Sequence, residues 1–170
     1  MLVTNNGMSI RFNEEDVRPM GRVAAGVRGI KLKGDDSVIS MEVITPEEQK
    51  AGRQLMIIME NGYGKRTDIE EYLAQGRGGM GVKTAQVTAK TGKLVAGYIV
   101  EPKDKRDLLI VSKGGQVIRT AVTSVSVIGR ATQGVRVMRF KQPGDLVATA
   151  TLVGLVEEVV ATEKEKTKKE

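Results

Sequence analysis

The stretch Gly129-Arg-Ala-Thr-Gln-Gly-Val-Arg136 occurs in two earlier variants, Gly21–Arg28 and Gly76–Lys83. Each copy is a glycine and an arginine followed, after three further residues, by glycine, valine and a basic residue. A turn glycine and an arginine precede every copy at the same distance: Gly7 and Arg11, Gly62 and Arg66, Gly115 and Arg119. The spacing from turn glycine to last basic residue is 21 residues each time, which predicts a repeat architecture.

Runs rich in valine, isoleucine and threonine flank these loops, as strands require. In the second copy, Gln54–Glu60 and Tyr63–Thr67 are predicted to form a hairpin about an Asn-Gly turn. Val82–Thr88 and Leu94–Val100 are predicted to form a second pair, and the acidic Asp68–Ala74 a turn or one helical loop. The third copy repeats the strand runs at Asp107–Ser112, Gln116–Thr120, Val135–Phe140 and Leu146–Val153. Four strands in each copy predict an all-β fold of propeller-like blades.

The repeat divides the chain into three blades and a tail. The blades are assigned to residues 1–44, 54–100 and 107–153, with charged linkers at Thr45–Arg53 and Glu101–Arg106. Residues 154–170 mix glutamate and lysine and are predicted to be a disordered tail or a frayed helix. Three blades would leave two open sheet edges, which proteins normally avoid, so we expect a partial ring: a fragment, or one half of a larger ring.

Composition narrows the class of function. The chain has no cysteine and no histidine, which removes disulfides, thiolate metal sites and the commonest general base. No apolar run is long enough to span a membrane and the start lacks a leader pattern, so a cytoplasmic protein without a membrane partner is expected. A net charge of +6 favours a polyanionic partner, and only 3% of residues are aromatic, which argues against base stacking. Contacts with the phosphates of duplex DNA are therefore expected, with no cofactor.

The glycine loops suit phosphate binding. Glycine lets backbone N–H groups approach a phosphate, and arginine can bind it through two parallel hydrogen bonds. Repeated once per blade, such loops would follow a bent duplex along a rim. The predicted DNA-binding side chains are Arg22, Arg28, Lys31, Lys65, Arg66, Arg77, Lys83, Arg130, Arg136 and Arg139, and the loop glycines are Gly21, Gly26, Gly76, Gly78, Gly79, Gly81, Gly129 and Gly134. The alternative is that the glycines only make turns and the basic side chains are solvated or paired with carboxylates.

Three further patterns are less specific. Arg11, Arg66 and Arg119 lie at strand ends, where an inter-strand salt bridge fits the sequence as well as a phosphate contact. Gly76–Gly81 lacks the Gly-Lys-Ser/Thr ending of a nucleotide-binding P-loop. The acidic cluster Glu14–Asp16 is typical of a solvated loop, and neither a metal site nor a catalytic residue is predicted.

The three modules resemble the C-terminal domain of bacterial DNA gyrase A. The resemblance rests on Ser9–Arg22, Glu60–Thr67 and Val127–Arg136, and it covers residues 1–153. It implies a β-pinwheel, a ring of usually six blades that exchange a strand with their neighbours, in which these three match the last. It also implies that a basic rim wraps duplex DNA for a type IIA topoisomerase that introduces negative supercoils. In that enzyme gyrase A joins the ATPase subunit, gyrase B, in a heterotetramer on the bacterial nucleoid, and the catalytic residues lie in other regions.

One segment departs from the family's pattern. The signature heptad of the family's first blade is Gln-Arg-Arg-Gly-Gly-Lys-Gly, whereas Gln75–Gly81 has glycine at Gly76 and methionine at Met80. The heptad's role in wrapping is therefore not carried onto this loop as a whole. Three other classes stay open: the equivalent domain of topoisomerase IV, a propeller-like scaffold that binds proteins, and an enzyme, although no nucleophile–base pair is evident.

Overall fold

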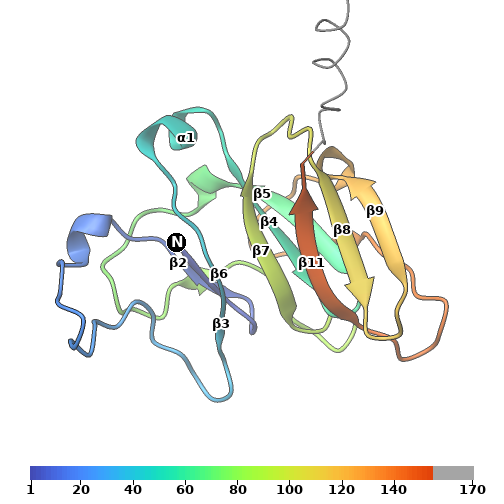
Figure 1. Ribbon diagram of the computed structural model, residues 1–170, viewed down its shortest axis with the longest axis horizontal. Coiled ribbons are helices and arrows are strands. Elements are labelled where there is room, and N and C mark those ends of the chain that lie inside the picture. The colour runs from blue at the N-terminus through green and yellow to red at the C-terminus, as the bar shows by residue number, and fades with distance from the viewer. Residues whose placement is uncertain (155–170) are drawn as a thin grey trace, which may run out of the picture.

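The computed structural model describes residues 1–154, which form three antiparallel sheets and confirm the predicted all-β, propeller-like architecture (Figure 1). The first sheet has the order β3–β1–β2–β6, with bounds Val38–Met41, Leu2–Thr4, Met8–Ile10 and Val82–Lys83. The second is β10–β5–β4–β7, with bounds Val135–Arg136, Tyr63–Asp68, Gln54–Met59 and Leu94–Val100. The third is β11–β8–β9, with bounds Val147–Val153, Asp107–Ser112 and Val117–Ala121. Apart from Gly154, the predicted tail lies outside the described residues.

Consecutive sheets are joined by strand exchange. β6 belongs to the second module but pairs with β2 of the first, with Val82 opposite Ser9. In the same way, β10 of the third module pairs with β5 of the second, with Val135 opposite Gly64. The strand exchange implied by the family resemblance is therefore present at both joints, and the third sheet has three strands within residues 1–154 instead of four.

The predicted pairing of Val82–Thr88 with Leu94–Val100 is wrong. Only Val82–Lys83 is a strand, and β7 pairs with β4 instead. The same correction applies to Val135–Phe140, of which only Val135–Arg136 is a strand, paired with β5. The physical reason is that the glycine loop before each exchanged strand carries the chain onto the preceding sheet, so neighbours in sequence are not neighbours in the sheet.

The structure contains the turns that the sequence predicts. β4 and β5 form the predicted hairpin about Gly62, whose φ of 76° favours glycine. The acidic segment contains one 3₁₀ turn, Ile69–Glu71, as predicted. The first linker contains a short helix, α1 (Pro46–Lys50), which begins at a capping box between Thr45 and Glu48.

Two apolar cores lie between the sheets, one on each face of the central sheet. Every residue of β4 is buried, because the first module covers one face and the third module covers the other. Leu55, Ile57 and Met59 belong to the core shared with the first module, whereas Met56 and Ile58 belong to the core shared with the third. Side chains alternate between the faces of a strand, so one apolar run serves both cores. Burial of each such side chain contributes about 2 kcal/mol.

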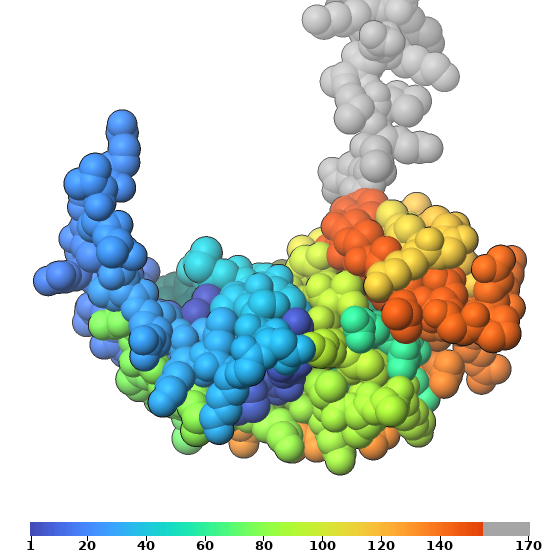
Figure 2. Space-filling model, turned by 90° about the horizontal axis from the view of Figure 1, so that it is seen from below, coloured from blue at the N-terminus to red at the C-terminus, as the bar shows by residue number. Residues whose placement is uncertain are grey.

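The modules lie side by side in chain order, with the first and third at opposite ends (Figure 1). Their strands β3, β7 and β11 contact one another in turn: Ser40 Oγ donates to Gly97 O at 2.9 Å, and Tyr98 OH donates to Ala150 O at 2.5 Å. Figure 2 shows part of the first module, in blue, projecting from its end of the body. The central module is therefore packed on both sides by the other two modules.

Candidate nucleic-acid interface

The second and third glycine loops lie at the joints between modules. The backbone N–H of Gly78 donates to Gly29 O of the first module at 2.8 Å. Gly81 has a φ of 72°, and a Cβ there would stand 2.1 Å from Ser9 O. Gly134 repeats this arrangement in the third module with a φ of 80°. These three glycines let one module's loop pack closely on the preceding sheet, which supports the structural alternative for them.

The other loop glycines have more room. A Cβ at Gly21, Gly26 or Gly76 would meet no atom within 4 Å. A Cβ at Gly79 or Gly129 would have its nearest neighbouring atom at 3.8 or 3.7 Å respectively, which is ordinary van der Waals contact. Close approach of a phosphate to the backbone at these five positions stays a prediction.

Lys65 is buried, which corrects its assignment to DNA. Its Nζ donates to Gly129 O at 2.7 Å, to Thr132 Oγ1 at 3.0 Å, and to the carbonyl oxygen of Arg130. Burial lowers the pKa of the ammonium to about 8. The side chain therefore ties β5 to the third module's loop and cannot reach a phosphate.

The lowered pKa of Lys65 predicts a pH dependence of stability. The folded chain loses this proton near pH 8, whereas the unfolded chain keeps it until about pH 10. Between these values the unfolded chain binds more protons, so the free energy of unfolding rises with pH, by about 1 kcal/mol after solvent screening. Denaturant unfolding from about pH 7.5 to 9.5 measures this rise. Lys65→Met is expected to flatten it, and an unchanged slope in that variant would contradict the assignment.

Arg66 is also buried, which is the second correction to the predicted DNA contacts. Its Nε donates to Val125 O at 2.8 Å and its Nη2 to Thr123 O at 3.0 Å. Its Nη1 donates to Gln54 Oε1 at 3.0 Å and to Pro102 O at 3.1 Å. These four acceptors come from the second module, the second linker and the third module, so the guanidinium fastens two blades together.

The arginine four residues after the turn glycine also links two modules at the first joint. Arg11 of the first module donates to Tyr72 O of the second at 3.1 Å, as Arg66 donates to the third. Arg119 of the third module is exposed instead and pairs with Asp107 on the neighbouring strand at 2.7 Å. Within residues 1–154 the inter-strand salt bridge allowed by the sequence is therefore present for Arg119 and for neither Arg11 nor Arg66.

Arg77 and Arg130 lie at the joints and stay partly exposed. The Arg77 side chain donates to Asp16 O at 3.0 Å and to Arg28 O at 2.8 Å. The Arg130 guanidinium stands 6.0 Å from the centroid of the Tyr72 ring. Within residues 1–154 neither forms a salt bridge with a carboxylate, so both keep a positive charge at the surface.

Five other predicted cations are exposed. They come from all three modules and form no salt bridge in the part of the chain that the structure describes. They are Arg22, Arg28, Lys31, Lys83 and Arg139. Their charge is available to an anion, because an unpaired surface cation gives up only solvent when it binds a phosphate.

A basic cluster surrounds Tyr63 at the second joint. The Arg136 guanidinium stands 4.8 Å from the ring centroid, and its Nη2 donates to the phenol oxygen at 2.8 Å. Lys90 Nζ lies 5.6 Å from the same centroid. Sequence reasoning missed Lys90, because it lies outside the repeated motif and only the fold brings it to the ring.

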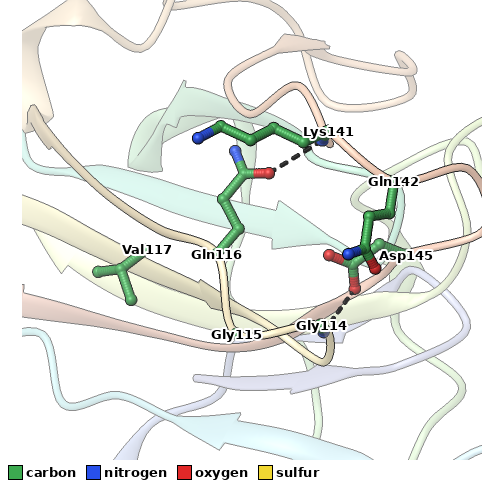
Figure 3. Close-up of a pocket in the computed structure, with 7 residues that line it drawn as sticks. All are labelled: Gly114, Gly115, Gln116, Val117, Lys141, Gln142 and Asp145. Atoms are coloured by element: carbon green, nitrogen blue, oxygen red, sulfur yellow. Dashed lines mark hydrogen bonds between the residues drawn. The ribbon is translucent and has the colours of Figure 1, made fainter.

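The described residues hold no cluster of metal-ligating side chains. Within residues 1–154 no group of three carboxylates could hold a metal ion, and none of the helices has the length and apolar character needed to cross a bilayer. Figure 3 shows a hollow beside the turn before β9. Its Asp145 accepts from the Gly114 N–H at 2.8 Å, and its Gln116 accepts from the Lys141 N–H at 3.0 Å. These polar groups close the turn, so the hollow has no evident substrate-binding chemistry.

Sheets linked by strand exchange, with cations on the loops between them, define a β-propeller module with a basic surface. The family described as DNA gyrase C-terminal domain, beta-propeller, matches this chain over residues 1–45, 53–101 and 106–153. The chain belongs to that family.

Similar proteins agree with this membership. The chain is 40% identical over 153 residues to DNA gyrase A of Staphylococcus epidermidis, covering 90% of the chain and 16% of that protein. It is 43% identical over 152 residues to DNA gyrase A of Mycobacterium tuberculosis, covering 88% of the chain and 17% of that protein. The chain thus spans about a sixth of the length of these curated relatives.

Two solved structures share the fold. A DNA gyrase A C-terminal domain matches with a TM-score of 0.73 and 27% identity, over 90% of this chain and 50% of that one. The C-terminal domain of a DNA topoisomerase IV matches with a TM-score of 0.79 and 23% identity, over 89% and 45%. The second likeness supports the fold alone, whereas the curated relatives above are gyrase proteins.

Proposed function

We propose that this chain binds the backbone of duplex DNA without sequence preference and bends it along the loops of successive modules. The observation that carries the proposal is an exposed cation in every module that forms no salt bridge within residues 1–154: Lys31 in the first, Lys83 in the second and Arg139 in the third. Charges spread over three adjoining modules favour a long polyanion over a small ligand, because one small anion could meet only one of them.

The aromatic residues support backbone contact over base contact. Tyr63 and Tyr72 are buried, and the Tyr98 hydroxyl donates to Ala150 O between two sheets. Binding of unpaired bases needs exposed aromatic faces on which the bases stack. A folded module without exposed tyrosines therefore suits the outside of a duplex, where phosphates are the first groups met.

We propose further that the chain acts as part of DNA gyrase A, assembled with the ATPase subunit, gyrase B, on the bacterial nucleoid. Curated gyrase A relatives at 40% and 43% identity favour gyrase over topoisomerase IV. In that setting the module is non-catalytic: it bends DNA, and the enzyme's supercoiling reaction uses ATP hydrolysed on the partner protein.

The salt dependence of DNA affinity tests the proposal. The triple variant Lys31→Gln, Lys83→Gln and Arg139→Gln removes one exposed charge from each module. Each phosphate neutralised contributes about 0.9 to the slope of log K against log salt, so the variant should lower that slope by up to about 3. Fluorescence anisotropy with several labelled duplexes measures the slope, and the loss should be similar for every sequence.

A matched control separates local contact from net charge. Lys50→Gln, Lys103→Gln and Lys105→Gln make the same change in charge at exposed linker positions. This control should leave the slope close to that of the parent chain. Equal losses in both triple variants, or a duplex affinity that does not change with salt, would contradict the proposed interface. DNA ligated around the chain should also show a shift in topoisomers, and an unshifted distribution would mean that the chain binds DNA without wrapping it.

A further inference from the structure

The two joints between modules place a cation at the same position but differ around it. Lys83 lies opposite Met8 at the first joint, and Arg136 lies opposite Tyr63 at the second. Lys83 and Arg136 are both exposed, and each follows the second glycine of its loop by two residues. The two joints therefore present the same charge at this position, and what distinguishes them as anion-binding sites is the set of residues around it.

At the second joint, two cations lie against one aromatic ring. Tyr63 is only 7% exposed, whereas Lys90 and Arg136 are exposed. The Arg136 guanidinium stands 4.8 Å from the ring centroid, and its Nη2 donates to the phenol oxygen at 2.8 Å. Lys90 Nζ lies 5.6 Å from the same centroid. An aromatic ring attracts cations, so Tyr63 limits the positions of both side chains before any ligand binds.

The turn that carries Lys90 is itself bound to the hairpin turn beside it. Asn61 Nδ2 donates to Ala89 O at 2.9 Å and to Lys90 O at 3.0 Å. The Glu60 carboxylate, on the same hairpin turn, accepts from the Lys93 backbone N–H at 2.8 Å. Within residues 1–154 neither cation beside the tyrosine ring forms a salt bridge. Two positive charges are therefore held close together, one of them on a backbone that the Asn61 side chain fixes.

The first joint has acidic side chains in the corresponding turn. Asp35 and Asp36 lie in the turn before β3, as Lys90 lies in the turn before β7. Asp36 accepts from the Asn6 N–H at 3.0 Å, and Asp35 pairs with Lys93 of the second module at 2.6 Å. The methionine that replaces tyrosine at this joint offers no aromatic face to a cation. The first joint thus combines its cation with negative charge, whereas the second combines its cation with another cation.

The charge of whole modules changes in the same direction. Each of the three modules has six basic residues, whereas the acidic residues number six in the first module, four in the second and two in the third. The second joint lies between the two modules that have an excess of positive charge. A polyanion is therefore attracted more strongly to the second joint than to the first.

We propose that Lys90 and Arg136, held by Tyr63, form the principal phosphate-binding site within residues 1–154. Duplex DNA is then held more tightly at the second joint than at the first. The inference rests on the proposed function and adds to it which joint dominates. Two cations that repel each other gain from a shared anion, and side chains already held against a ring lose less conformational freedom on binding. The phosphates of a DNA strand follow one another closely enough for one or two of them to meet both cations.

The double variant Lys90→Gln with Arg136→Gln tests the site by fluorescence anisotropy on a labelled duplex. Each phosphate contact contributes about 0.9 to the slope of log K against log salt, which is roughly an eightfold change in affinity at ~0.1 M salt. Loss of two contacts should therefore lower the duplex affinity about 60-fold at that salt concentration and reduce the slope by about 1.8.

The matched control is Lys33→Gln with Lys83→Gln. It removes two exposed charges from the corresponding turn and strand of the first joint. The control should lose at most about eightfold in affinity, because the two acids of that turn already counter the charge of Lys33. Circular dichroism should show the folded signal of the parent chain in both double variants, since all four side chains are exposed.

Tyr63→Met separates the effect of the ring from that of the charges. The substitution gives the second joint the residue that the first joint has at this position, and it leaves both cations in place. Affinity should fall roughly threefold to fivefold, while the salt slope stays that of the parent chain. A variant that binds as tightly as the parent chain would overturn the role given to the ring.

The comparison of the two joints decides the inference separately from the proposed function. Equal losses in the two double variants would overturn the dominance of the second joint and leave DNA binding by the chain intact. A parent chain whose duplex affinity does not change with salt would contradict the proposed function, and this inference with it. A larger loss at the second joint, with the slope reduced by about twice as much as in the control, is the expected result.

Discussion

Arg66→Met is expected to lower the free energy of unfolding by about 3 to 5 kcal/mol. The substitution keeps an unbranched apolar stem but removes the guanidinium and with it every donor. The carbonyl oxygens of Thr123, Val125 and Pro102, and the amide oxygen of Gln54, would lose their partner. A buried polar group left unsatisfied costs about 1 to 3 kcal/mol, and the loss is shared among four acceptors that can partly rearrange.

Equilibrium unfolding in denaturant, followed by circular dichroism, measures the loss for Arg66→Met. Arg139→Met is the matched control, because it removes the same charge from an exposed side chain. The control should change stability by less than about 0.5 kcal/mol. A similar small change in both variants would show that Arg66 does not hold the second and third modules together.

The sequence predicts the repeat and its hairpins well because these depend on local chemistry. An Asn-Gly turn between two apolar runs specifies the hairpin about Gly62 with no knowledge of the neighbouring module. The register of the glycine loops also shows that each module has one such loop. Neither pattern states which sheet the strand after the loop joins, and for this reason the sequence predicts the wrong partner for Val82–Lys83.

Lys65 and Arg66 show the same limit for the candidate interface. A lysine and an arginine in a basic protein favour a surface position, since buried charge is costly. Here the cost is offset by backbone carbonyl oxygens at the following module's turn, such as those of Gly129 and Val125. Acceptors of this kind are present at every residue, so no side-chain pattern marks them. Lys83 and Arg139, in contrast, are exposed, as expected for basic side chains.

A glycine substitution at a joint between modules is expected to cause the second large loss of stability. Gly81→Ala is expected to destabilise the chain by about 3 to 5 kcal/mol. The residue has a φ of 72°, which costs alanine about 1 to 2 kcal/mol. In addition, the new Cβ would stand 2.1 Å from Ser9 O, a backbone atom that cannot move without breaking the β2–β6 pairing.

Gly144→Ala separates these two causes. Gly144 has a similar φ of 79°, but a Cβ there would meet no atom within 4 Å. Its variant should therefore lose only the backbone term of about 1 to 2 kcal/mol. Denaturant unfolding compares the two variants, and hydrogen exchange shows whether the amides paired between Ser9 and Val82 lose protection in Gly81→Ala alone. Equal losses would mean that conformational freedom explains both glycines, and that the close contact between the loop and β2 contributes little to holding the modules together.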